Sequence, residues 1–109
     1  MSYNIIQTDN FNREVKQLAK KYSSIKVDLQ TLKIELEANP ELGSPLGKNV
    51  FKIRMAIASK GKGKSGGARV ITYIYVQGER VFLLSIYDKS EKVKISNLEI
   101  KTYLKNLPL

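Results

Sequence analysis

The fold of this chain is decided by residues 51–57, which read Phe51-Lys52-Ile53-Arg54-Met55-Ala56-Ile57. Apolar side chains alternate with basic or small ones, and this period of two predicts a β-strand with one buried face. The other face carries Lys52 and Arg54. Basic residues on an exposed strand face also protect a sheet against aggregation, so these two alone do not establish a binding surface.

Two further strands are predicted on the C-terminal side. Ala68 to Val76 is rich in β-branched and aromatic residues, and a tight turn at Gln77-Gly78-Glu79 leads into Arg80 to Tyr87. The run Val81-Phe82-Leu83-Leu84 places apolar residues on both faces of its strand, which predicts burial on both sides. Together the three segments predict an antiparallel meander.

Helical periodicity governs the N-terminal side. After a short β-leaning segment at Tyr3–Gln7, apolar residues recur at helical spacing from Phe11 to Tyr22 and again from Ile25 to Leu36. Asn39-Pro40 ends the second helix, because the residue before a proline is disfavoured in the α region. The short link between the helices predicts an antiparallel hairpin, and glycines and a proline mark Glu41–Gly47 as a loop.

Near the C-terminus, Ser96 and Glu99 have the spacing of a capping box, which predicts a last helix through Leu107. The sequence thus predicts one α+β domain of two layers over residues 1–109. In it an N-terminal helical hairpin packs on a mainly antiparallel four-stranded sheet, and a short C-terminal helix follows. A chain of about 110 residues is close to the commonest domain size.

Composition excludes several classes of function. The 109 residues include 19 Lys and Arg, 10 Asp and Glu, and no His or Cys, for a formal net charge of +9. Without Cys there is no disulfide or thiolate chemistry, and without both His and Cys the usual zinc and copper sites are not expected. We therefore expect no metal and no other cofactor. The lack of a long apolar run, and of a signal peptide at Met1-Ser2-Tyr3-Asn4, predicts a cytoplasmic protein with no membrane partner.

The excess positive charge is concentrated in one segment. The 22 residues from Lys48 to Arg69 hold no acidic residue and seven basic ones, which are Lys48, Lys52, Arg54, Lys60, Lys62, Lys64 and Arg69. A surface of this kind attracts polyanions such as nucleic acid. Metal-free RNA cleavage suits these residues, because the ribose 2′-hydroxyl supplies the nucleophile. The protein then needs only to hold a phosphate, stabilise added negative charge and move two protons.

Three segments together resemble the RelE/ParE toxin superfamily: Phe51-Lys52-Ile53-Arg54, Gly67 to Tyr73, and Val81 to Glu91. The long loop Ser59–Gly67 is most similar to the HigB-type branch. The resemblance implies a RelE-like fold and a bacterial toxin of a type II toxin–antitoxin pair. RelE- and HigB-like members cut mRNA in the ribosomal A site without a metal, whereas ParE-like members inhibit DNA gyrase. All are neutralised by a co-expressed antitoxin, which is often acidic.

The resemblance also implies roles for individual residues. Lys52 and Arg54 fall on paired basic residues of RelE-like strands, the candidate base and phosphate holder. Arg69 falls on the arginine that stabilises the transition state. Lys89 falls on a basic residue just after the last strand. The family's catalytic tyrosine corresponds to a place near Ile95, where this sequence has no tyrosine.

We therefore predict a ribosome-dependent mRNA endonuclease toxin. Its catalytic candidates are Lys52, Arg54, Arg69, Tyr87 and Lys89, where Tyr87 lies two residues before Lys89 and suits the Ile-Tyr-x-Lys ending of the HigB-type branch. The residues predicted to contact RNA or the ribosome are Lys48, Lys60, Lys62 and Lys64. The expected partners are the ribosome, mRNA and a cognate, acidic antitoxin, with which the chain could form a hetero-oligomer. The alternatives are a ParE-like gyrase inhibitor and an inactive relative that keeps RNA binding.

Overall fold

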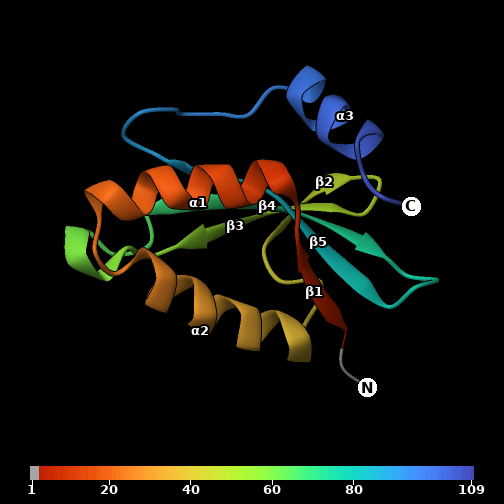
Figure 1. Cartoon of the computed structure of the whole chain (residues 1–109), viewed down its shortest axis with the longest axis horizontal. Coiled ribbons are helices and arrows are strands. Elements are labelled where there is room, and N and C mark those ends of the chain that lie inside the picture. Colours follow the sequence, from red (N-terminus) through yellow and green to blue (C-terminus); the bar gives the residue numbers. More distant parts are fainter. Residues whose placement is uncertain (1–2) are drawn as a thin grey trace.

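The computed structural model describes residues 3–109, so Met1 and Ser2 of the predicted domain 1–109 lie outside the described residues (Figure 1). The α+β class, the helical hairpin, the meander and the last helix are confirmed. In chain order the elements are β1 (Asn4–Gln7), α1 (Asp9–Lys21), α2 (Ile25–Ala38), β2 (Ser44–Gly47), β3 (Val50–Met55), the 3-10 helix η1 (Ala58–Lys60), β4 (Ala68–Tyr75), β5 (Arg80–Asp88) and α3 (Asn97–Lys105).

The sheet has five strands in the order β1-β5-β4-β3-β2, and β1 lies parallel to β5 while the other pairs are antiparallel. The predicted count of four strands is therefore wrong. Strand β2 lies within the predicted loop Glu41–Gly47. It joins β3 through Lys48-Asn49, whose φ angles of 53° and 64° make a turn with both central residues left-handed. Such turns usually contain Asn-Gly or Asp-Gly, and this sequence lacks that signal.

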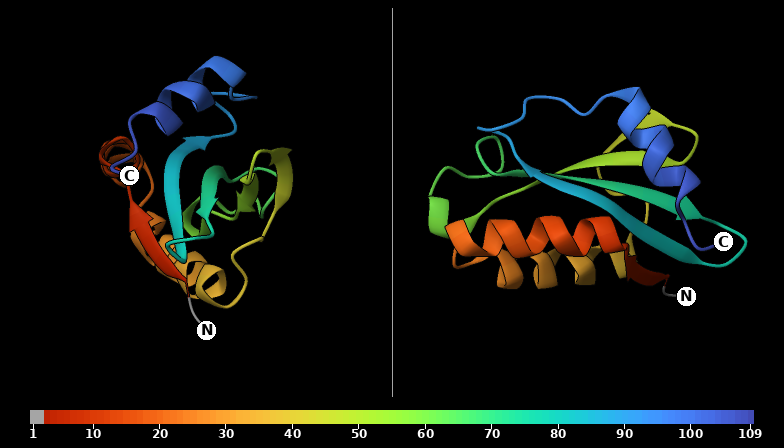
Figure 2. Two further views of the ribbon diagram at one scale, coloured as in Figure 1. Left: turned by 90° about the vertical axis from the view of Figure 1, so that its right-hand side faces the viewer. Right: turned by 45° about the horizontal axis from the view of Figure 1, so that its top comes forward.

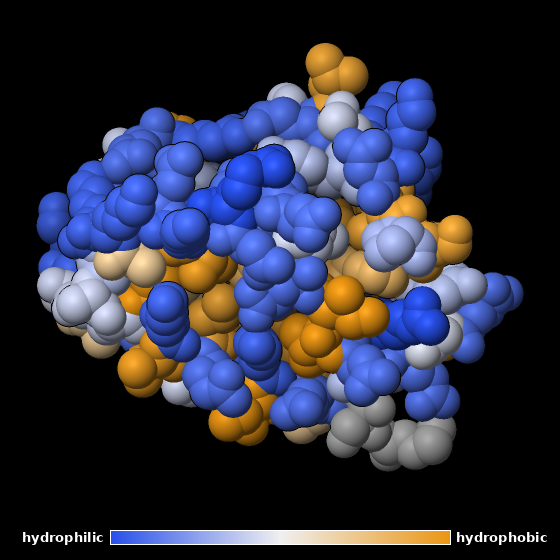
Figure 3. Space-filling view, viewed as in Figure 1, coloured by the Kyte–Doolittle hydropathy of each residue, from blue (hydrophilic) through white to orange (hydrophobic). Residues whose placement is uncertain are grey.

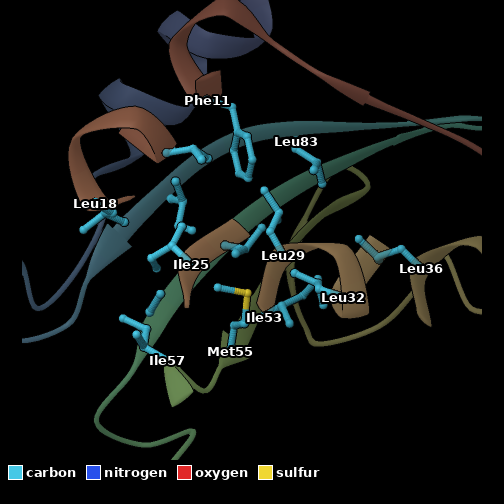
Figure 4. Packing of buried hydrophobic residues seen from close by; sticks show 14 of the residues in the cluster. Phe11, Leu18, Ile25, Leu29, Leu32, Leu36, Ile53, Met55, Ile57 and Leu83 are labelled. Carbon is cyan, nitrogen blue, oxygen red and sulfur yellow. The ribbon is translucent and has the colours of Figure 1, made fainter. Parts of the chain in front are cut away.

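Helices α1 and α2 cover one face of the sheet, and α3 lies on the other, over β5 (Figure 2). On the first face, Phe11 of α1 and Leu29 of α2 pack against Ile53 of β3 and Leu83 of β5 (Figure 4). On the second face, a smaller cluster that includes Phe82 packs against α3. The predicted burial of β5 on both sides is confirmed, and α3 adds a partial third layer to the two that were predicted.

Hydrogen bonds define the starts of α1 and α3 and confirm the predicted capping box, while α3 ends at Lys105, two residues before the predicted Leu107. Thr8 caps α1, where its hydroxyl accepts from the Phe11 N–H at 3.2 Å. Ser96 and Glu99 form the reciprocal bonds of a capping box at the start of α3. Within residues 3–109 there is no helix with the length and apolar character that crossing a bilayer requires.

A β-bulge in β5 determines which side chains face each side of the sheet. Leu83 pairs with Thr72 and Ser85 pairs with Ile71, so one extra residue of β5 lies between two neighbours on β4. Before the bulge, odd-numbered residues of β5 face α1 and α2. After it, the even-numbered Ile86 faces these helices and Tyr87 faces away from them.

Polar side chains of α1 stabilise this bulge, which lies just beyond the last residue of β5 that pairs with β1. The Asn10 side chain donates to the Leu84 carbonyl at 3.0 Å. The Glu14 carboxylate accepts from the Ser85 hydroxyl at 2.8 Å and from the Ile86 N–H at 3.2 Å. Burial raises the pKa of Glu14, and these hydrogen bonds oppose the rise. Helix α1 therefore fixes the register that turns Tyr87 to the opposite face of the sheet.

Candidate active site

A row of three side chains crosses the sheet on the face away from α1 and α2. Arg54 of β3 lies opposite Arg69 of β4, and Arg69 lies opposite Tyr87 of β5. Residues directly paired across strands project to the same face. The structure thus brings an exposed arginine, a buried arginine and a tyrosine from three separate segments of the chain into one line.

Lys52 joins this row on the same face of β3. Its neighbour Ile53 packs into the helical core, and alternation along the strand directs Lys52 and Arg54 to the other face. Lys52 is half-buried, and Arg54 and Lys64 are exposed. These three side chains line a common groove, and we refer to the surface that they form as the basic face.

Arg69 lies beneath the basic face and is only 4% exposed. Its guanidinium donates to the carbonyls of Lys64 and Ser65, both at 3.0 Å, and to that of Ala68 at 3.2 Å. Burial and the nearby charge of Arg54 lower the pKa of Arg69, but an arginine remains charged at any pH that a protein meets. Arg69 therefore ties Gly61–Gly67, which we call the basic loop, to the sheet and supplies a fixed positive charge beneath it.

Tyr87 is 6% exposed and is covered by the segment that leads to α3. The Lys92 ammonium lies 5.5 Å from the centre of the Tyr87 ring. The Tyr87 hydroxyl lies near the Ile95 N–H but makes no hydrogen bond within residues 3–109. Burial raises the pKa of Tyr87. The phenol is thus next to Arg69 in the sheet but out of contact with solvent.

Lys60 is held in an ion pair away from the row. Its ammonium lies 2.8 Å from Asp88 Oδ1, and its side chain is 10% exposed. Asp88 also accepts from the Tyr22 hydroxyl at 2.6 Å and the Ser90 hydroxyl at 2.7 Å. Although burial acts to raise it, hydrogen bonds from Lys60, Tyr22 and Ser90 hold the pKa of Asp88 well below its usual range. The charge of Lys60 is therefore already compensated by a carboxylate within the protein.

The other predicted basic residues lie at different distances from the row. Lys62 and Lys64 are exposed on the basic loop. Lys89 is half-buried, and its N–H donates to the Gly67 carbonyl at 3.1 Å, at the base of that loop. Lys48 lies in the turn between β2 and β3, at the N-terminal end of β3, whereas Arg54 lies near the C-terminal end of that strand. The structure thus brings Lys64 and Lys89 close to the row and leaves Lys48 remote from it.

Comparison with known proteins agrees with this architecture. Residues 3–107 match the sequence profile of a family described as the RelE toxin of the RelE/RelB toxin–antitoxin system. The chain belongs to the RelE toxin family. The predicted family and its fold are therefore confirmed.

Solved structures of RelE proteins have the same fold as this RelE-family chain. A doubly substituted Escherichia coli RelE toxin in the free state matches with a TM-score of 0.64 at 17% identity, over 98% of this chain and 99% of that one. The isolated E. coli RelE toxin matches with a TM-score of 0.63 at 16% identity, over 97% and 100%. The toxin–antitoxin complex RelBE2 from Mycobacterium tuberculosis matches with a TM-score of 0.61 at 17% identity, over 81% and 99%. Identities this low establish the fold alone.

Two carboxylates important to this RelE-family site escaped the sequence analysis. Asp88 directs Lys60 away from the basic face, and Glu14 holds the bulge that turns Tyr87 toward Arg69. Both act through partners 28 or more residues away in the sequence. The available signal was weak: Asp88 is the one acidic residue of β5, and Glu14 is one of two acidic residues of α1.

Proposed function

We propose that this RelE-family toxin is a ribosome-dependent mRNA endonuclease that inhibits translation without a metal. The observation that supports it is the basic face, where Lys52 and Arg54 lie side by side above the buried guanidinium of Arg69. Fixed positive groups of this kind suit a phosphodiester, whose negative charge increases as it reacts. We propose that the chain acts in the cytoplasm as a single domain.

In the proposed reaction, the RNA supplies its own nucleophile. The ribose 2′-hydroxyl loses its proton to a basic group, and its oxygen forms a bond to the adjacent phosphorus. The bond from that phosphorus to the 5′-oxygen of the next nucleotide breaks, and this oxygen takes up a proton. The products are a 2′,3′-cyclic phosphate and a 5′-hydroxyl end. The protein is required to align the phosphate, stabilise its charge and move the two protons.

We assign these roles to the residues of the row and to Lys89, which lies close to it. Lys52 takes the 2′-hydroxyl proton, and the exposed Arg54 holds the scissile phosphate. Arg69 stabilises the developing charge from beneath. Lys89, which is partly exposed at the base of the basic loop, returns a proton to the leaving oxygen. Tyr87 takes part only after the segment from Lys89 to Ser96 has moved, because its phenol is buried in the present arrangement.

A translation reaction with purified protein and a defined mRNA tests this function. We expect cleavage when ribosomes are present and intact mRNA when they are omitted, with 5′-hydroxyl ends on the downstream fragments. Intact mRNA together with blocked DNA supercoiling would instead identify a ParE-like gyrase inhibitor. Binding of RNA without cleavage would identify an inactive relative.

We also propose that a cognate antitoxin neutralises the chain and forms a hetero-oligomer with it. Two of the similar structures are toxin–antitoxin complexes, RelBE2 from M. tuberculosis and RelBE from E. coli. The net charge of +9 favours an acidic partner. Co-expression with an acidic reading frame adjacent to the gene is expected to restore growth to cells that produce the toxin.

Lys62→Ala is expected to weaken ribosome binding while leaving the chemical step unchanged. Lys62 is exposed on the basic loop and lies outside the Arg54–Arg69–Tyr87 row. Loss of one phosphate contact reduces the slope of log affinity against log salt by about 1. Ribosome co-sedimentation at several salt concentrations measures this slope, and Lys101→Ala, at an exposed position on α3, is the matched control. A reduced cleavage rate at saturating ribosomes would contradict the assignment.

A further inference from the structure

The basic loop, Gly61–Gly67, is anchored to the fold at both ends. Before it, the Lys60 ammonium lies 2.8 Å from the buried carboxylate of Asp88. At its far end, Gly67 packs so closely on β3 that a Cβ there would lie 2.2 Å from the Met55 carbonyl oxygen. A loop fixed at both ends holds its backbone groups in place before a ligand arrives, which lowers the entropic cost of binding.

Arg69 fixes the orientation of two peptide groups in this loop. Its guanidinium donates to the carbonyls of Lys64 and Ser65, both at 3.0 Å. The peptide bonds within residues 3–109 are all trans, and the C=O and N–H of a trans peptide point in opposite directions. The N–H groups that follow these two carbonyls, those of Ser65 and Gly66, therefore point away from the guanidinium.

The amides of the basic loop are available to a ligand. Within residues 3–109, no protein group accepts a hydrogen bond from any N–H between Lys62 and Gly66. Residues 61–65 are exposed, and Gly66 is partly exposed. Successive free N–H groups in a turn form a concavity that binds anions. The amides of Ser65 and Gly66 are adjacent donors of this kind.

Glycines allow the loop to take this shape. Gly61 and Gly63 have φ angles of 74° and 64°, in the left-handed region. A Cβ at either position would meet no atom within 4 Å, so the surroundings would admit a side chain. What these two glycines contribute is therefore the backbone conformation itself, which other residues adopt only at a cost.

Positive charge surrounds these two amides. Lys62 lies against Gly66, because a Cβ on Gly66 would come within 2.7 Å of the Lys62 Cβ. Lys64 lines the same groove as Arg54 of the basic face. Arg69, whose guanidinium binds the loop, pairs with Arg54 across the sheet. The loop thus adjoins the basic face, and a single buried guanidinium connects the two.

We propose that the Ser65 and Gly66 amides bind a second phosphodiester of the RNA, next to the scissile phosphate on the basic face. The proposal rests on the function proposed above. Backbone amides that contact phosphate carry no sequence information, so this subsite positions the RNA without reading its bases. Arg69 serves both phosphates, because it holds the two amides in place and supplies charge beneath the scissile group.

The composition of the loop favours RNA over an acidic protein segment. The basic loop contains only glycine, lysine and serine, so it offers a protein partner no apolar side chain. Exposed apolar side chains lie instead along α2, where they interrupt the hydrophilic surface (Figure 3). The loop and the basic face together provide places for two neighbouring phosphates, whereas a free phosphate ion would use only one of them.

Nuclear magnetic resonance of the full-length chain tests the subsite. The probe is a short RNA whose 2′-hydroxyls are all methylated, so that it lacks the nucleophile and stays intact. We expect the amide resonances of Ser65 and Gly66 to shift when this RNA binds. The Gly78 amide, in the turn between β4 and β5, should stay unchanged. No response at Ser65 and Gly66, with or without binding of the RNA elsewhere on the chain, would overturn the proposal.

Gly63→Ala and Gly47→Ala form a matched pair of variants. Both replace a left-handed glycine whose Cβ would meet no atom within 4 Å, one in the basic loop and one at the end of β2. We expect Gly63→Ala to weaken binding of the methylated RNA about tenfold, because the loop amides lose their alignment, and Gly47→Ala to change it less than about twofold. Equal effects in two variants that thermal unfolding shows to be folded would overturn the proposal.

The salt dependence of binding separates recognition by amides from attraction by charge. Gly63→Ala removes no cation, so the slope of log affinity against log salt should stay at its wild-type value while the affinity falls. A slope that falls together with the affinity would assign the effect to displaced lysines and would overturn the role of the amides.

Other anions identify the source of the phosphate. Inorganic phosphate and polyglutamate are each added to the labelled chain in place of the RNA. We expect neither to shift the Ser65 and Gly66 amides at concentrations at which the RNA saturates them. Saturation by inorganic phosphate alone would identify a free-phosphate site, and saturation by polyglutamate alone would identify an acidic protein segment. Either result would overturn the proposal.

Cleavage of mRNA by the wild-type chain separates this proposal from the proposed activity. If the chain fails to cleave while the two amides respond to RNA, the nuclease function fails and the phosphate subsite stands. If the chain cleaves and the two amides do not respond, the subsite fails and the nuclease function stands.

Discussion

Arg69→Ala is expected to reduce ribosome-dependent mRNA cleavage about 100- to 1,000-fold, the usual effect of removing one preorganised group that stabilises transition-state charge. The guanidinium lies in register with Arg54 and is held by the carbonyls of Lys64 and Ser65. Its removal deletes the fixed charge that we propose lies beneath the scissile phosphate, and it releases the basic loop from the sheet. Single-turnover cleavage at saturating ribosomes measures the chemical step apart from binding.

Two further variants separate charge from geometry at this position. Arg69→Lys keeps the charge but loses the planar fork that bonds two loop carbonyls at once, so we expect an intermediate rate. Arg80→Ala removes an arginine at the other end of the sheet, where it pairs with Tyr75, and should leave cleavage unchanged. Thermal unfolding of each variant checks the fold. Full toxicity of Arg69→Ala at wild-type expression would refute the role given to this residue.

Local signals in the sequence predicted most of the fold. The capping box at Ser96 and the two-sided burial of β5 depend on neighbours within a few residues, and both are confirmed. Strand β2 was missed because the two central residues of the turn that joins it to β3, Lys48 and Asn49, are left-handed although neither is a glycine. The bulge in β5 was missed because its hydrogen bonds come from Glu14, which is 71 residues from Ser85. Features fixed by distant partners leave no periodic trace in the sequence.

The sequence indicated a basic surface but did not distinguish among its lysines. Lys60 and Lys62 lie two residues apart in the same acid-free segment, yet Lys60 is bound to a carboxylate and Lys62 is exposed. The difference arises from Asp88, 28 residues beyond Lys60, which the fold brings to the end of β5. Charge counting therefore predicts that a polyanion-binding face exists, and only tertiary structure shows which charges remain available to it.

Asp88→Asn is expected to lower the free energy of unfolding by about 3 kcal/mol, the lower end of the range for a buried ion pair, because the Lys60 ammonium loses its counter-charge but keeps some contact with solvent. The Asp88 side chain is fully buried, and that of Lys60 is 10% exposed. For a domain of this size, such a loss lowers the melting temperature by roughly 4–8 °C per kcal/mol. Glu91→Gln is the matched control, because Glu91 and Lys21 form an exposed pair, and exposed pairs contribute about 0–1 kcal/mol.

Removing both charges tests whether the loss comes from the unpaired ammonium. Replacing the pair by neutral groups is expected to recover part of the stability, so Lys60→Met combined with Asp88→Asn should be more stable than Asp88→Asn alone. Chemical denaturation of the wild type, Lys60→Met, Asp88→Asn and the double variant gives the coupling free energy. A double variant no more stable than Asp88→Asn would place the loss in the hydrogen bonds from Tyr22 and Ser90 instead of in the ion pair.

The pH dependence of stability provides an independent check, because its sign follows from the direction of the Asp88 shift. Its hydrogen-bonded partners hold the pKa of Asp88 below the value of the unfolded chain. A carboxylate with a depressed folded-state pKa stabilises the protein above its unfolded pKa of about 4, and this contribution disappears as the pH falls toward the folded-state pKa. The difference in stability between the wild type and Asp88→Asn should therefore be constant near neutral pH and shrink progressively below about pH 4. A difference that stays constant into this acidic range would mean that ionised Asp88 does not stabilise the fold.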